Sequence, residues 1–476
     1  MTLNVALVCP PSGKYKMQSD ISMARELGFV NKGQYLHPPI GVAYVAALLQ
    51  KEGHKCIIID AVAEDMDKTA VMERLKEFNP DVVLVQLVTP LFRDSMAQLR
   101  EYKKQGWIAG VAGPHATVFP DSCLDEGADF VIRKEPEYTM RDLASVIEKK
   151  TSWDSVLGIS WIKNNKKIHN KERPLIANLD DLPFPARDLL PWKNYKIPFG
   201  KDSAYTVILT SRGCPYNCIF CGTHIYYGRT LRLRSGKNVV DEIEEIVNKF
   251  GINHFSLWDD TFTVNKQHVM DVCNEIIRRG LKVKWYCLGR ADNVDEEALA
   301  IMKKAGCYQI QYGFESGSEQ VLKYMRKGIT PEQIRNAVRL TAKAGIEVSA
   351  LFVIGFPEET EEDIEKTIEI AKTPGIKWAQ FNIATPYPGT DMYDMVKKDL
   401  KEEWEAFDSY NVLDMKRKVD KKRLMKLMRK AHREFYFRPS RILMEMKDLS
   451  PKSLSNKLWT LKQFLKLYVM PQKKEC

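Results

Sequence analysis

Ser211-Arg-Gly-Cys-Pro-Tyr-Asn-Cys-Ile-Phe-Cys221 is the segment that decides the fold of this chain. It directly follows an apolar run, Tyr205–Thr210, that is typical of a buried strand. Its cysteines, Cys214, Cys218 and Cys221, have the spacing Cys-x3-Cys-x2-Cys. Three thiolates so close together on a loop can converge on one soft metal centre. The segment therefore predicts a metal site at the end of a strand.

The sequence after this segment repeats one pattern up to about Thr390. Apolar runs alternate with amphipathic helical segments. Six such runs predict a curved, incomplete barrel, because a closed barrel of this kind has eight strands. The expected strands are Tyr205–Thr210, His254–Trp258, Val283–Cys287, Tyr308–Phe314, Val348–Ile354 and Ala379–Ala384. The expected helices include Asn238–Lys249, Gln267–Arg279 and Pro331–Ala344.

The first 150 residues alternate in a similar way, with short β-rich runs between helices. This pattern predicts an α/β fold, a doubly wound parallel sheet covered by helices on both faces. Ligands of such sheets bind beyond the carboxyl ends of the strands, near the loops at 9–13 and 113–117. The expected strands are Asn4–Val8, Cys56–Asp60, Val82–Val88, Trp107–Val111 and Phe130–Ile132. The expected helices are Gly41–Lys51, Lys68–Phe78 and Arg93–Lys104.

The two alternating parts are joined by a different kind of segment. Ser155–Asn164 and Lys167–Leu175 can pair as strands around a polar turn. The prolines between Asp180 and Pro191 are incompatible with a helix and mark a boundary. We therefore expect four regions: a sheet domain at 1–150, a linker with a strand pair at 151–200, a partial barrel at 201–392 and a basic helical C-terminal region at 393–476.

The composition indicates a folded chain of enzyme size. Of the 476 residues, 44% are hydrophobic, which is enough for the cores of two or three domains. The N-terminus does not have the pattern of a secretory signal, and no run of about 18 apolar residues occurs. Only three of the ten cysteines cluster, which is unlike a disulfide framework. We expect a cytoplasmic protein.

The cysteine segment has an alternative interpretation as a zinc site. His224 stands three residues after Cys221 and could serve as a fourth ligand. Pro215 and Phe220 within the loop, and the position of the loop after a barrel strand, favour a cluster instead. A non-enzymatic zinc or corrinoid binding protein is the corresponding alternative for the whole chain.

The cysteine spacing, with an aromatic residue before the last cysteine and five more βα units after it, resembles the radical S-adenosylmethionine superfamily. The resemblance extends over about Tyr205–Thr390. It implies that Cys214, Cys218 and Cys221 bind a [4Fe–4S] cluster and leave one iron open for S-adenosylmethionine. It also implies that Phe220 packs near the adenine.

Three further segments resemble motifs of the same superfamily. They are Leu257-Trp-Asp-Asp-Thr-Phe262, Tyr312-Gly-Phe-Glu-Ser-Gly-Ser318 and Phe352-Val-Ile-Gly-Phe-Pro-Glu358. The resemblance implies that Asp260 lies near the methionine amino group, that Glu315 lies near the ribose or carboxylate, and that Gly355 lets the adenine approach the backbone. Arg290, at the end of the expected third barrel strand, could face the same site.

Each of these residues also has a purely structural interpretation. One carboxylate of the pair Asp259 and Asp260 could cap the next helix. Glu315 could be a solvated strand end, and Gly355 could simply turn the chain.

The first part of the chain, about Met1–Glu148, resembles the cobalamin-binding class of the superfamily. The resemblance rests on Val5-Ala-Leu-Val-Cys-Pro-Pro11, on Pro38–Leu49, on Ile57–Asp60 and on Ala112-Gly-Pro-His-Ala116. It implies a corrinoid across the carboxyl edge of the sheet, with contacts at Pro11 and His115. The Asp-x-His-x-x-Gly motif that supplies a cobalt ligand in many cobalamin proteins is absent. His115 is therefore not expected to bind cobalt, and Gly-Pro-His could equally be a tight turn.

The positive charge of the chain is concentrated at its end. Residues 396–476 contain 22 Lys and Arg against 11 Asp and Glu, whereas the net charge of the whole chain is +10. Residues 454–469 place leucines on one helical stripe with lysines beside it. Such a helix could pack on the barrel or rest on an anionic membrane surface. No RNA-binding module is evident, so no specific nucleic acid is expected as a partner.

Together these resemblances imply a radical enzyme. An electron donor such as flavodoxin or ferredoxin would reduce the cluster, and cleavage of S-adenosylmethionine would give a 5′-deoxyadenosyl radical that takes hydrogen from an unactivated carbon. With methylcobalamin present, the substrate radical would collect a methyl group, so carbon methylation of a small-molecule or lipid-like substrate is the first hypothesis. The alternative is radical cyclisation, coupling or rearrangement of a lipid-like or tetrapyrrole-like substrate without methyl transfer. No side chain stands out as a general acid or base, which fits chemistry carried by cofactors.

Overall fold

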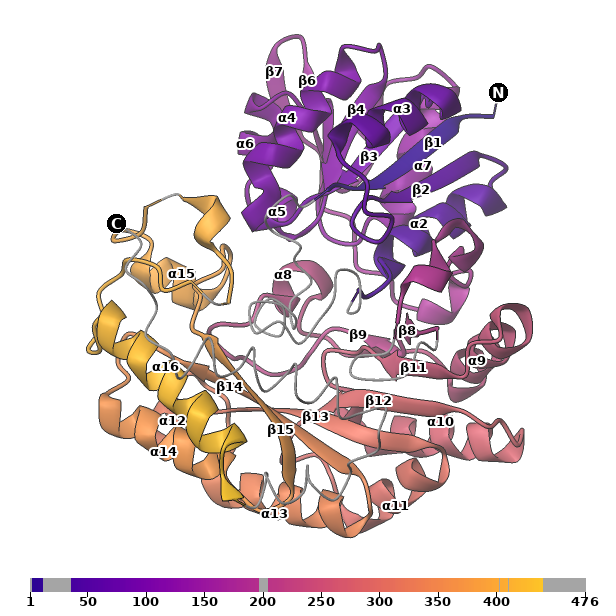
Figure 1. Cartoon of the computed structure of the whole chain (residues 1–476). Helices are drawn as coiled ribbons and strands as arrows, with labels where there is room; N and C mark the ends of the chain where they lie inside the picture. The colour runs from indigo at the N-terminus through magenta and orange to yellow at the C-terminus, as the bar shows by residue number, and fades with distance from the viewer. Residues whose placement is uncertain (1, 12–35, 197–203, 402, 410, 440–476) are drawn as a thin grey trace.

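The structure, a computed structural model, describes residues 2–11, 36–196, 204–401, 403–409 and 411–439. Two curved sheets, each covered by helices, account for most of these residues (Figure 1). Within the described ranges no helix is long and apolar enough to cross a membrane. The predicted helix at 454–469 lies outside the described residues.

The first sheet has the predicted doubly wound form. Its strand order is β2-β1-β3-β4-β5-β6-β7, and the first five strands are parallel. Its strands are β1 Asn4–Cys9, β2 Lys55–Asp60, β3 Val82–Gln86, β4 Ile108–Ala112, β5 Phe130–Ile132, β6 Ile159–Lys163 and β7 Lys166–His169. Its helices are α2 Ile40–Lys51, α3 Lys68–Phe78, α4 Phe92–Lys103, α5 Pro114–Val118, α6 Pro120–Asp125 and α7 Glu137–Glu148.

Alternate residues of these strands are buried on opposite faces of the sheet. Leu7 and Leu84 belong to one hydrophobic core, whereas Val8 and Val85 belong to another. Near-continuous apolar strands are expected when both faces of a parallel sheet are covered. The prediction made from the short apolar runs is therefore confirmed.

The predicted strand pair between the two parts forms, but both strands are shorter than predicted, and β6 begins at Ile159 where the prediction began at Ser155. β6 and β7 are antiparallel, and β6 pairs with β5, so the pair extends the first sheet. Asn164 and Asn165 make the turn with φ values of 49° and 59°, a conformation that asparagine tolerates better than most residues. β7 ends at His169, where the prediction continued to Leu175. The division of the chain into four regions stays a prediction.

The second sheet is an open, partial barrel of six parallel strands in the order β15-β14-β13-β12-β11-β8. Its strands are β8 Thr206–Ile208, β11 His254–Leu257, β12 Lys284–Gly289, β13 Cys307–Glu315, β14 Glu347–Ile354 and β15 Ile376–Ile383. The main helices around it are α9 Gly236–Phe250, α10 Lys266–Arg278, α11 Glu296–Lys304, α12 Glu319–Tyr324, α13 Pro331–Lys343 and α14 Glu361–Ala371. The six predicted strands are all present.

The two faces of the barrel sheet differ in burial. Ile310, Ala350 and Phe381 are fully buried in the core shared with the surrounding helices. Residues of the opposite face alternate with them and are half-buried: Gln311, Ser349 and Gln380 are examples. The interior face therefore carries neutral polar side chains together with apolar ones such as Leu351 and Val353.

A short antiparallel ribbon, which the sequence did not predict, follows the first barrel strand. It pairs β9 Ser211–Arg212 with β10 Arg232–Leu233, and α8 Thr223–Tyr227 lies between the two. Beyond the barrel, α15 Asp391–Val396 and α16 Lys421–Tyr436 confirm a helical C-terminal extension, and α16 packs against α14 and β15. Lys430 pairs with Glu365 of α14 at 2.6 Å, and Arg423 pairs with Glu361 at 2.7 Å. Part of the basic charge of the tail thus faces the acidic side of α14.

Candidate functional site

The cysteine loop lies between β9 and α8, at the carboxyl end of the first barrel strand (Figure 1). Its middle residue, Ile219, is 2% exposed and anchors the loop. The amide of Ile219 donates to the carbonyl of Met325 at 3.1 Å, and the carbonyl of Ile219 accepts from the amide of Met392 at 2.9 Å. The loop is therefore tied both to the end of α12 and to the start of α15.

The exposure of the cysteines separates this loop from the rest of the chain. Cys214, Cys218 and Cys221 are half-buried, whereas the other cysteines in the described part of the chain are buried. Burial raises the pKa of the Cys214 and Cys218 thiols. Without metal these thiols are protonated at neutral pH, so metal loading releases protons.

The loop does not have the arrangement of a mononuclear zinc site. Among the residues that the structure describes, no group of three His, Cys, Asp or Glu side chains surrounds a position for a single metal ion. Nδ1 of His224 instead lies 3.0 Å from the carbonyl oxygen of Cys221. A cubane binds each cysteine to a separate iron, so a cluster does not require the three thiols to converge on one position.

The aromatic residue of the loop, Phe220, packs against the barrel edge, and its predicted place near the adenine stays a prediction. The ring of Phe220 contacts Phe356 edge to face, with centroids 5.6 Å apart. Phe356 follows Gly355 at the carboxyl end of β14. The loop is thereby brought against the fifth barrel strand.

Arg290 lies against the same loop. Its guanidinium is 3.6 Å from the centroid of the Tyr216 ring, and its Nε is 2.7 Å from a carboxylate oxygen of Asp292. The hydroxyl of Tyr216 donates to Asn293 at 2.7 Å. Arg290 also donates to the carbonyl of Lys327. Arg290 thus contacts Tyr216, which lies between Cys214 and Cys218 in the loop. This contact is consistent with the prediction that Arg290 faces the site.

Glu315 is held in an unusual backbone conformation beside the loop. Its φ is +67°, and the pairing of β13 with β14 shifts at this point. Its carboxylate pairs with the ammonium of Lys327 at 2.8 Å, and both side chains are about one tenth exposed. The charges of Lys327, Glu315 and Arg290 all act on the Cys218 thiol. This places a buried ion pair next to the second cysteine of the loop.

Lys327 was not among the residues predicted from the sequence. It lies between α12 and α13, outside the segments that resemble superfamily motifs, whereas its partner Glu315 lies inside one of them. A lysine followed by Gly328, which has φ +70°, was the available signal for a turn at this place.

The two neighbouring aspartates after β11 have different roles. Asp259 is 2% exposed and accepts from the amides of Thr210 at 2.6 Å and Ser211 at 3.0 Å. It also accepts from the Thr210 hydroxyl. Burial raises the pKa of Asp259 to about 6. Asp259 therefore holds the segment that leads into the loop, and it ends β8 early because it takes the amides of Thr210 and Ser211.

Asp260 points to the loop itself. It accepts from the hydroxyl of Thr223 at 2.7 Å, and its charge acts on the Cys214 thiol. Burial raises the pKa of Asp260. Neither aspartate caps α10, because Asn265 accepts from the amide of His268 in that role.

Gly355 needs to be glycine for a structural reason. Its φ is +91°, and a Cβ there would lie 2.5 Å from Leu424 of α16. The amides of Gly355 and Phe356 donate to the buried carboxylate of Glu359, whose pKa burial raises to about 8. The turn interpretation therefore holds, and an approach of adenine to this backbone stays a prediction.

The carboxyl edge of the first sheet faces the cysteine loop. α5, which follows β4, contacts α8, which follows Cys221. Pro11 is buried at the end of β1. Gly113 has φ +141°, and a Cβ there would lie 2.2 Å from the carbonyl oxygen of Leu87. This edge is thus built from closely spaced backbone and small residues.

His115 does not reach out from this edge. It is 1% exposed and packs against Phe92, Phe119 and Trp404, with ring centroids 4.4 to 5.4 Å apart. Its Nδ1 is 3.3 Å from the hydroxyl oxygen of Thr89, and burial lowers its pKa to about 4. It can ligate cobalt only if this aromatic cluster opens. In this arrangement His115 offers no ring nitrogen at the surface of the edge, and contacts of Pro11 and His115 with a corrinoid stay predictions.

A second contact between the two parts involves His37, which sequence reasoning missed. Its ring packs on Trp258 with centroids 4.2 Å apart, and its Nδ1 lies 3.0 Å from the Tyr205 hydroxyl. The Tyr205 hydroxyl also bonds Ser256 at 2.7 Å and Tyr286 at 2.9 Å. This cluster lies beside the carboxyl end of β11, where the two aspartates begin.

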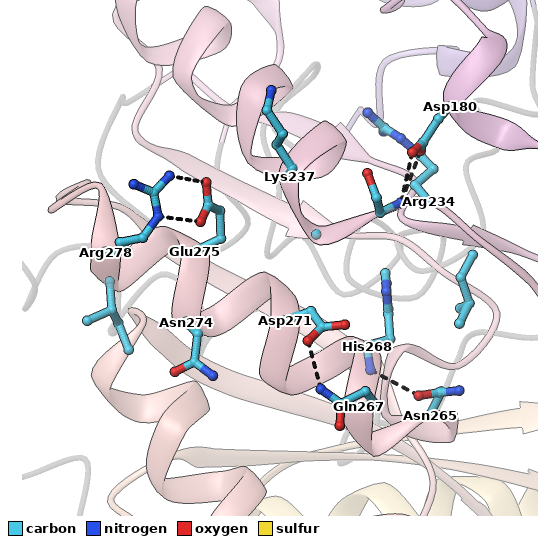
Figure 2. A pocket seen from close by; sticks show the side chains of 14 residues that line it. Asp180, Arg234, Lys237, Asn265, Gln267, His268, Asp271, Asn274, Glu275 and Arg278 are labelled. Atoms are coloured by element: carbon cyan, nitrogen blue, oxygen red, sulfur yellow. Dashed lines mark hydrogen bonds and ion pairs between the residues drawn. The ribbon is translucent and has the colours of Figure 1, made fainter.

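An open groove of about 960 Å³ lies elsewhere, along α9 and α10 (Figure 2). Its charged side chains pair largely with their neighbours: Arg278 with Glu275, and Asp180 with the amide of Ser235 (Figure 2). None of the predicted cofactor residues lines it. The groove is therefore separate from the candidate site.

Comparison with known proteins finds two family regions in the chain. Residues 208–371 match the Radical SAM superfamily, and residues 27–144 match the B12 binding domain. An uncharacterized methyltransferase of Pyrococcus horikoshii is 35% identical over 86% of this chain and 90% of its own length. An anaerobic magnesium-protoporphyrin IX monomethyl ester cyclase of Cereibacter sphaeroides is 30% identical over 78% of this chain and 61% of its own length.

The fold is shared with a solved structure of low sequence identity. The cobalamin-dependent S-adenosylmethionine radical enzyme OxsB, with aqua-cobalamin bound, has a TM-score of 0.72 and 18% identity. The match covers all of this chain and 74% of OxsB. The family matches make a [4Fe–4S] cluster, S-adenosylmethionine and cobalamin the cofactors of this enzyme. The chain belongs to the radical S-adenosylmethionine superfamily, in the B12-binding class that contains cobalamin-dependent methyltransferases.

Proposed function

We propose that this enzyme transfers a methyl group to an unactivated carbon of a small molecule, at the place where the carboxyl edges of its two sheets meet. The observation that carries the proposal is the contact of α5 with α8. It brings the edge that would hold the corrinoid next to the loop with the half-exposed cysteines. When bound, the cluster supplies the electron that cleaves S-adenosylmethionine, and cobalamin supplies the carrier for the methyl group.

The chain's own residues bind and orient the reactants. Cys214, Cys218 and Cys221 hold three irons of the cluster. The Lys327 ammonium, fixed by Glu315 at 2.8 Å, offers a positive charge beside Cys218, where it can meet the carboxylate of the methionine part. The rings of Phe220 and Phe356 form an apolar wall that excludes water from the same edge. The protein thus supplies orientation and electrostatics, and the cofactors supply the reactive atoms.

The substrate is expected to enter above the interior face of the barrel. Five half-buried side chains on this face are polar and carry no charge: Gln309, Gln311, Ser349, Gln380 and Asn382. Amide and hydroxyl groups match neutral hydrogen-bonding groups of a ligand. Because Leu351 and Val353 share this face with the polar side chains, we expect the part of the substrate nearest the barrel to be uncharged.

The second candidate function is radical cyclisation or rearrangement without methyl transfer. The 30% identical relative named as a cyclase favours it. In that case the same cysteine loop and the same edge would serve hydrogen abstraction alone.

One experiment separates the two functions. The protein is reconstituted anaerobically with iron and sulfide, with or without hydroxocobalamin, and given S-adenosylmethionine with a trideuterated methyl group and a chemical reductant. Methyl transfer predicts S-adenosylhomocysteine only when the corrinoid is present. 5′-Deoxyadenosine without S-adenosylhomocysteine, in both preparations, would reject methyl transfer and support the second candidate.

Two further expectations concern partners. The reductant would be a small electron carrier such as flavodoxin or ferredoxin, since the radical chemistry needs one electron per cleavage. The segment 454–469 would bind anionic vesicles if it is a membrane-surface helix. Liposome flotation of the full chain and of a chain truncated at residue 449 tests this, and equal flotation would exclude it.

A further inference from the structure

Two glutamates and two arginines form a buried ion-pair network between the two parts of the molecule. Glu135 and Glu137 stand just after β5, at the carboxyl edge of the first sheet, and Glu137 begins α7. Arg212 ends β9, two residues before Cys214, and Arg232 begins β10. The side chains of all four are at most 7% exposed.

The guanidinium of Arg212 spans the two carboxylates. Its Nη1 is 2.9 Å from Glu135, and its Nη2 is 2.6 Å from Glu137. Arg232 donates from one nitrogen to both carboxylate oxygens of Glu135, each at 2.9 Å. Because a guanidinium is planar and rigid, its two nitrogens fix the position of both carboxylates at once.

Aromatic rings hold the same guanidinium from both parts of the chain. Arg212 lies over Tyr44 of α2 and over Tyr227 of α8, each with 5.3 Å between the guanidinium and the ring centroid. The carbonyl of Tyr227 also accepts from Arg232 at 2.9 Å. The network therefore touches the segments on both sides of the cysteine loop.

The connection from Arg212 to the first cysteine is short and rigid. Only Gly213 separates them, with φ +85°, and a Cβ at Gly213 would lie 2.3 Å from the carbonyl oxygen of Thr230. The backbone of Gly213 is thus pressed against the segment that leads into β10. A displacement of Arg212 passes directly to Cys214.

Stability alone is a poor reason for such a network. Removing four charged groups from water costs much of what their attraction gains, so apolar residues of the same volume are often as stable. A buried ionic network does fix one geometry, because any shift leaves a charge unpaired. We propose that Glu135, Glu137, Arg212 and Arg232 are positioning residues, which set the distance and orientation of the cysteine loop relative to the carboxyl edge of the first sheet.

This proposal rests on the proposed function for what the two places hold, a cluster at the loop and a corrinoid at the edge. Misplacement of reacting groups by about 1 Å costs on the order of 100-fold in rate. Group transfer between the two cofactor sites therefore requires that their distance and orientation be fixed. None of the four side chains needs to touch either cofactor.

The test compares Glu137→Gln with Glu242→Gln. Glu242 is the control, because it is fully buried and its ion pairs, to Arg187 at 2.5 Å and to Arg234, involve no residue of the first sheet. The first readout uses protein without cofactors: hydrogen exchange of residues 211–222. We expect Glu137→Gln to raise exchange there about tenfold, and Glu242→Gln to raise it less than about twofold.

The second readout is magnetic. In protein reconstituted with cluster and cob(II)alamin, the reduced cluster speeds the electron-spin relaxation of cob(II)alamin. The acceleration is larger when the two centres are closer together. In Glu137→Gln, at equal iron and corrinoid content, we expect a smaller acceleration of relaxation with a wider distribution of rates. In Glu242→Gln we expect both to be unchanged. If Glu137→Gln does not fold, Arg212→Lys keeps the charge but loses the two-pronged contact, and the same results are expected.

The outcomes separate this proposal from the proposed function. Unchanged exchange at 211–222 and unchanged relaxation in Glu137→Gln would overturn the positioning role while leaving the cofactors in place. Equal changes in both variants would also overturn it, because they would indicate a general loss of packing. A wild-type protein that binds no corrinoid would reject the proposed function, and the exchange measurement would still decide the positioning role.

Discussion

The carboxyl edges of the two parallel sheets meet in this molecule, but they present different chemistry. The barrel edge carries three half-exposed cysteines and the buried pair of Glu315 and Lys327. The first-sheet edge carries Pro11 and Gly113, and its histidine is enclosed by aromatic rings. The barrel edge thus presents half-exposed thiols, whereas the histidine of the first-sheet edge is enclosed. The difference teaches that one substitution can remove a ligand from the cluster site, whereas substitution of the enclosed His115 is expected to matter little for the corrinoid site.

The largest expected effect breaks the barrel edge. Cys214→Ala removes a cluster ligand, so iron after reconstitution should fall from about four per chain to nearly none. Cys287 is a matched control, since it is buried in the barrel core. Cys287→Ala should keep its iron and lose about 1–2 kcal/mol of stability. Iron content and thermal denaturation check both, and full iron in Cys214→Ala would refute the ligand assignment.

A smaller effect is expected at the ion pair of the same edge. Lys327→Met leaves the Glu315 carboxylate without its partner and removes a positive charge beside Cys218. We expect 5′-deoxyadenosine formation to fall about 10- to 100-fold, which corresponds to about 1.5–3 kcal/mol, with iron unchanged.

The adjacent Arg326 provides the control for this variant. Its side chain is 52% exposed and pairs with Asp391 at the surface. Arg326→Met should leave 5′-deoxyadenosine formation within about twofold of wild type. Equal losses in both variants would show that Lys327 has no special part in the site.

A buried carboxyl group at the barrel edge, Glu359, also predicts that the stability of the fold depends on pH. Burial raises the pKa of Glu359 to about 8, above the ordinary value of a glutamate. A raised carboxyl pKa means that the folded state holds the proton more tightly than the unfolded state. The stabilisation of the fold that results is complete below about pH 4 and is lost as pH rises through 8.

Glu359→Gln removes the titration while keeping an acceptor for the amides of Gly355 and Phe356. Between about pH 5 and 8 the stability of wild type should fall relative to the variant by up to about 1.4 kcal/mol per pH unit. Chemical denaturation at pH 5, 6.5 and 8 measures this. A constant difference across that range would contradict a buried, protonated Glu359.

The smallest effect is expected at the first-sheet edge. His115→Phe preserves the packing against Phe92, Phe119 and Trp404. We expect the affinity for hydroxocobalamin to stay within about threefold of wild type, whereas the loss of a ligand or its support typically costs about 10- to 100-fold. A loss of that size, measured by equilibrium binding, would make the two edges alike and place His115 on the corrinoid.

Much of the fold could be predicted because local pattern and final structure agree. The six barrel strands and the five parallel strands of the first sheet were all visible as apolar runs between helices. The cysteine loop was visible because its chemistry lies in consecutive residues. The ribbon of β9 and β10 was not, since its two-residue strands are too short to carry a period of two.

The tertiary contacts of the candidate site could not be predicted from the sequence. Glu315 has a recognisable motif, but its positive φ and its partner Lys327 arise from tertiary structure. The division of labour between Asp259 and Asp260 depends on which carboxylate faces the amides of Thr210 and Ser211. His115 stood in a plausible loop, and its enclosure by Phe92 and Trp404 could not be deduced from local sequence.

The central claim is that Cys214, Cys218 and Cys221 hold a cluster that cleaves S-adenosylmethionine beside a corrinoid. The most direct test is anaerobic reconstitution with iron, sulfide and hydroxocobalamin, for wild type and for the variant with all three cysteines replaced by Ala. The account predicts about four irons and one corrinoid in wild type, with 5′-deoxyadenosine formed only when the cysteines are present. Zinc in place of iron, or 5′-deoxyadenosine formed equally by the variant, would contradict it.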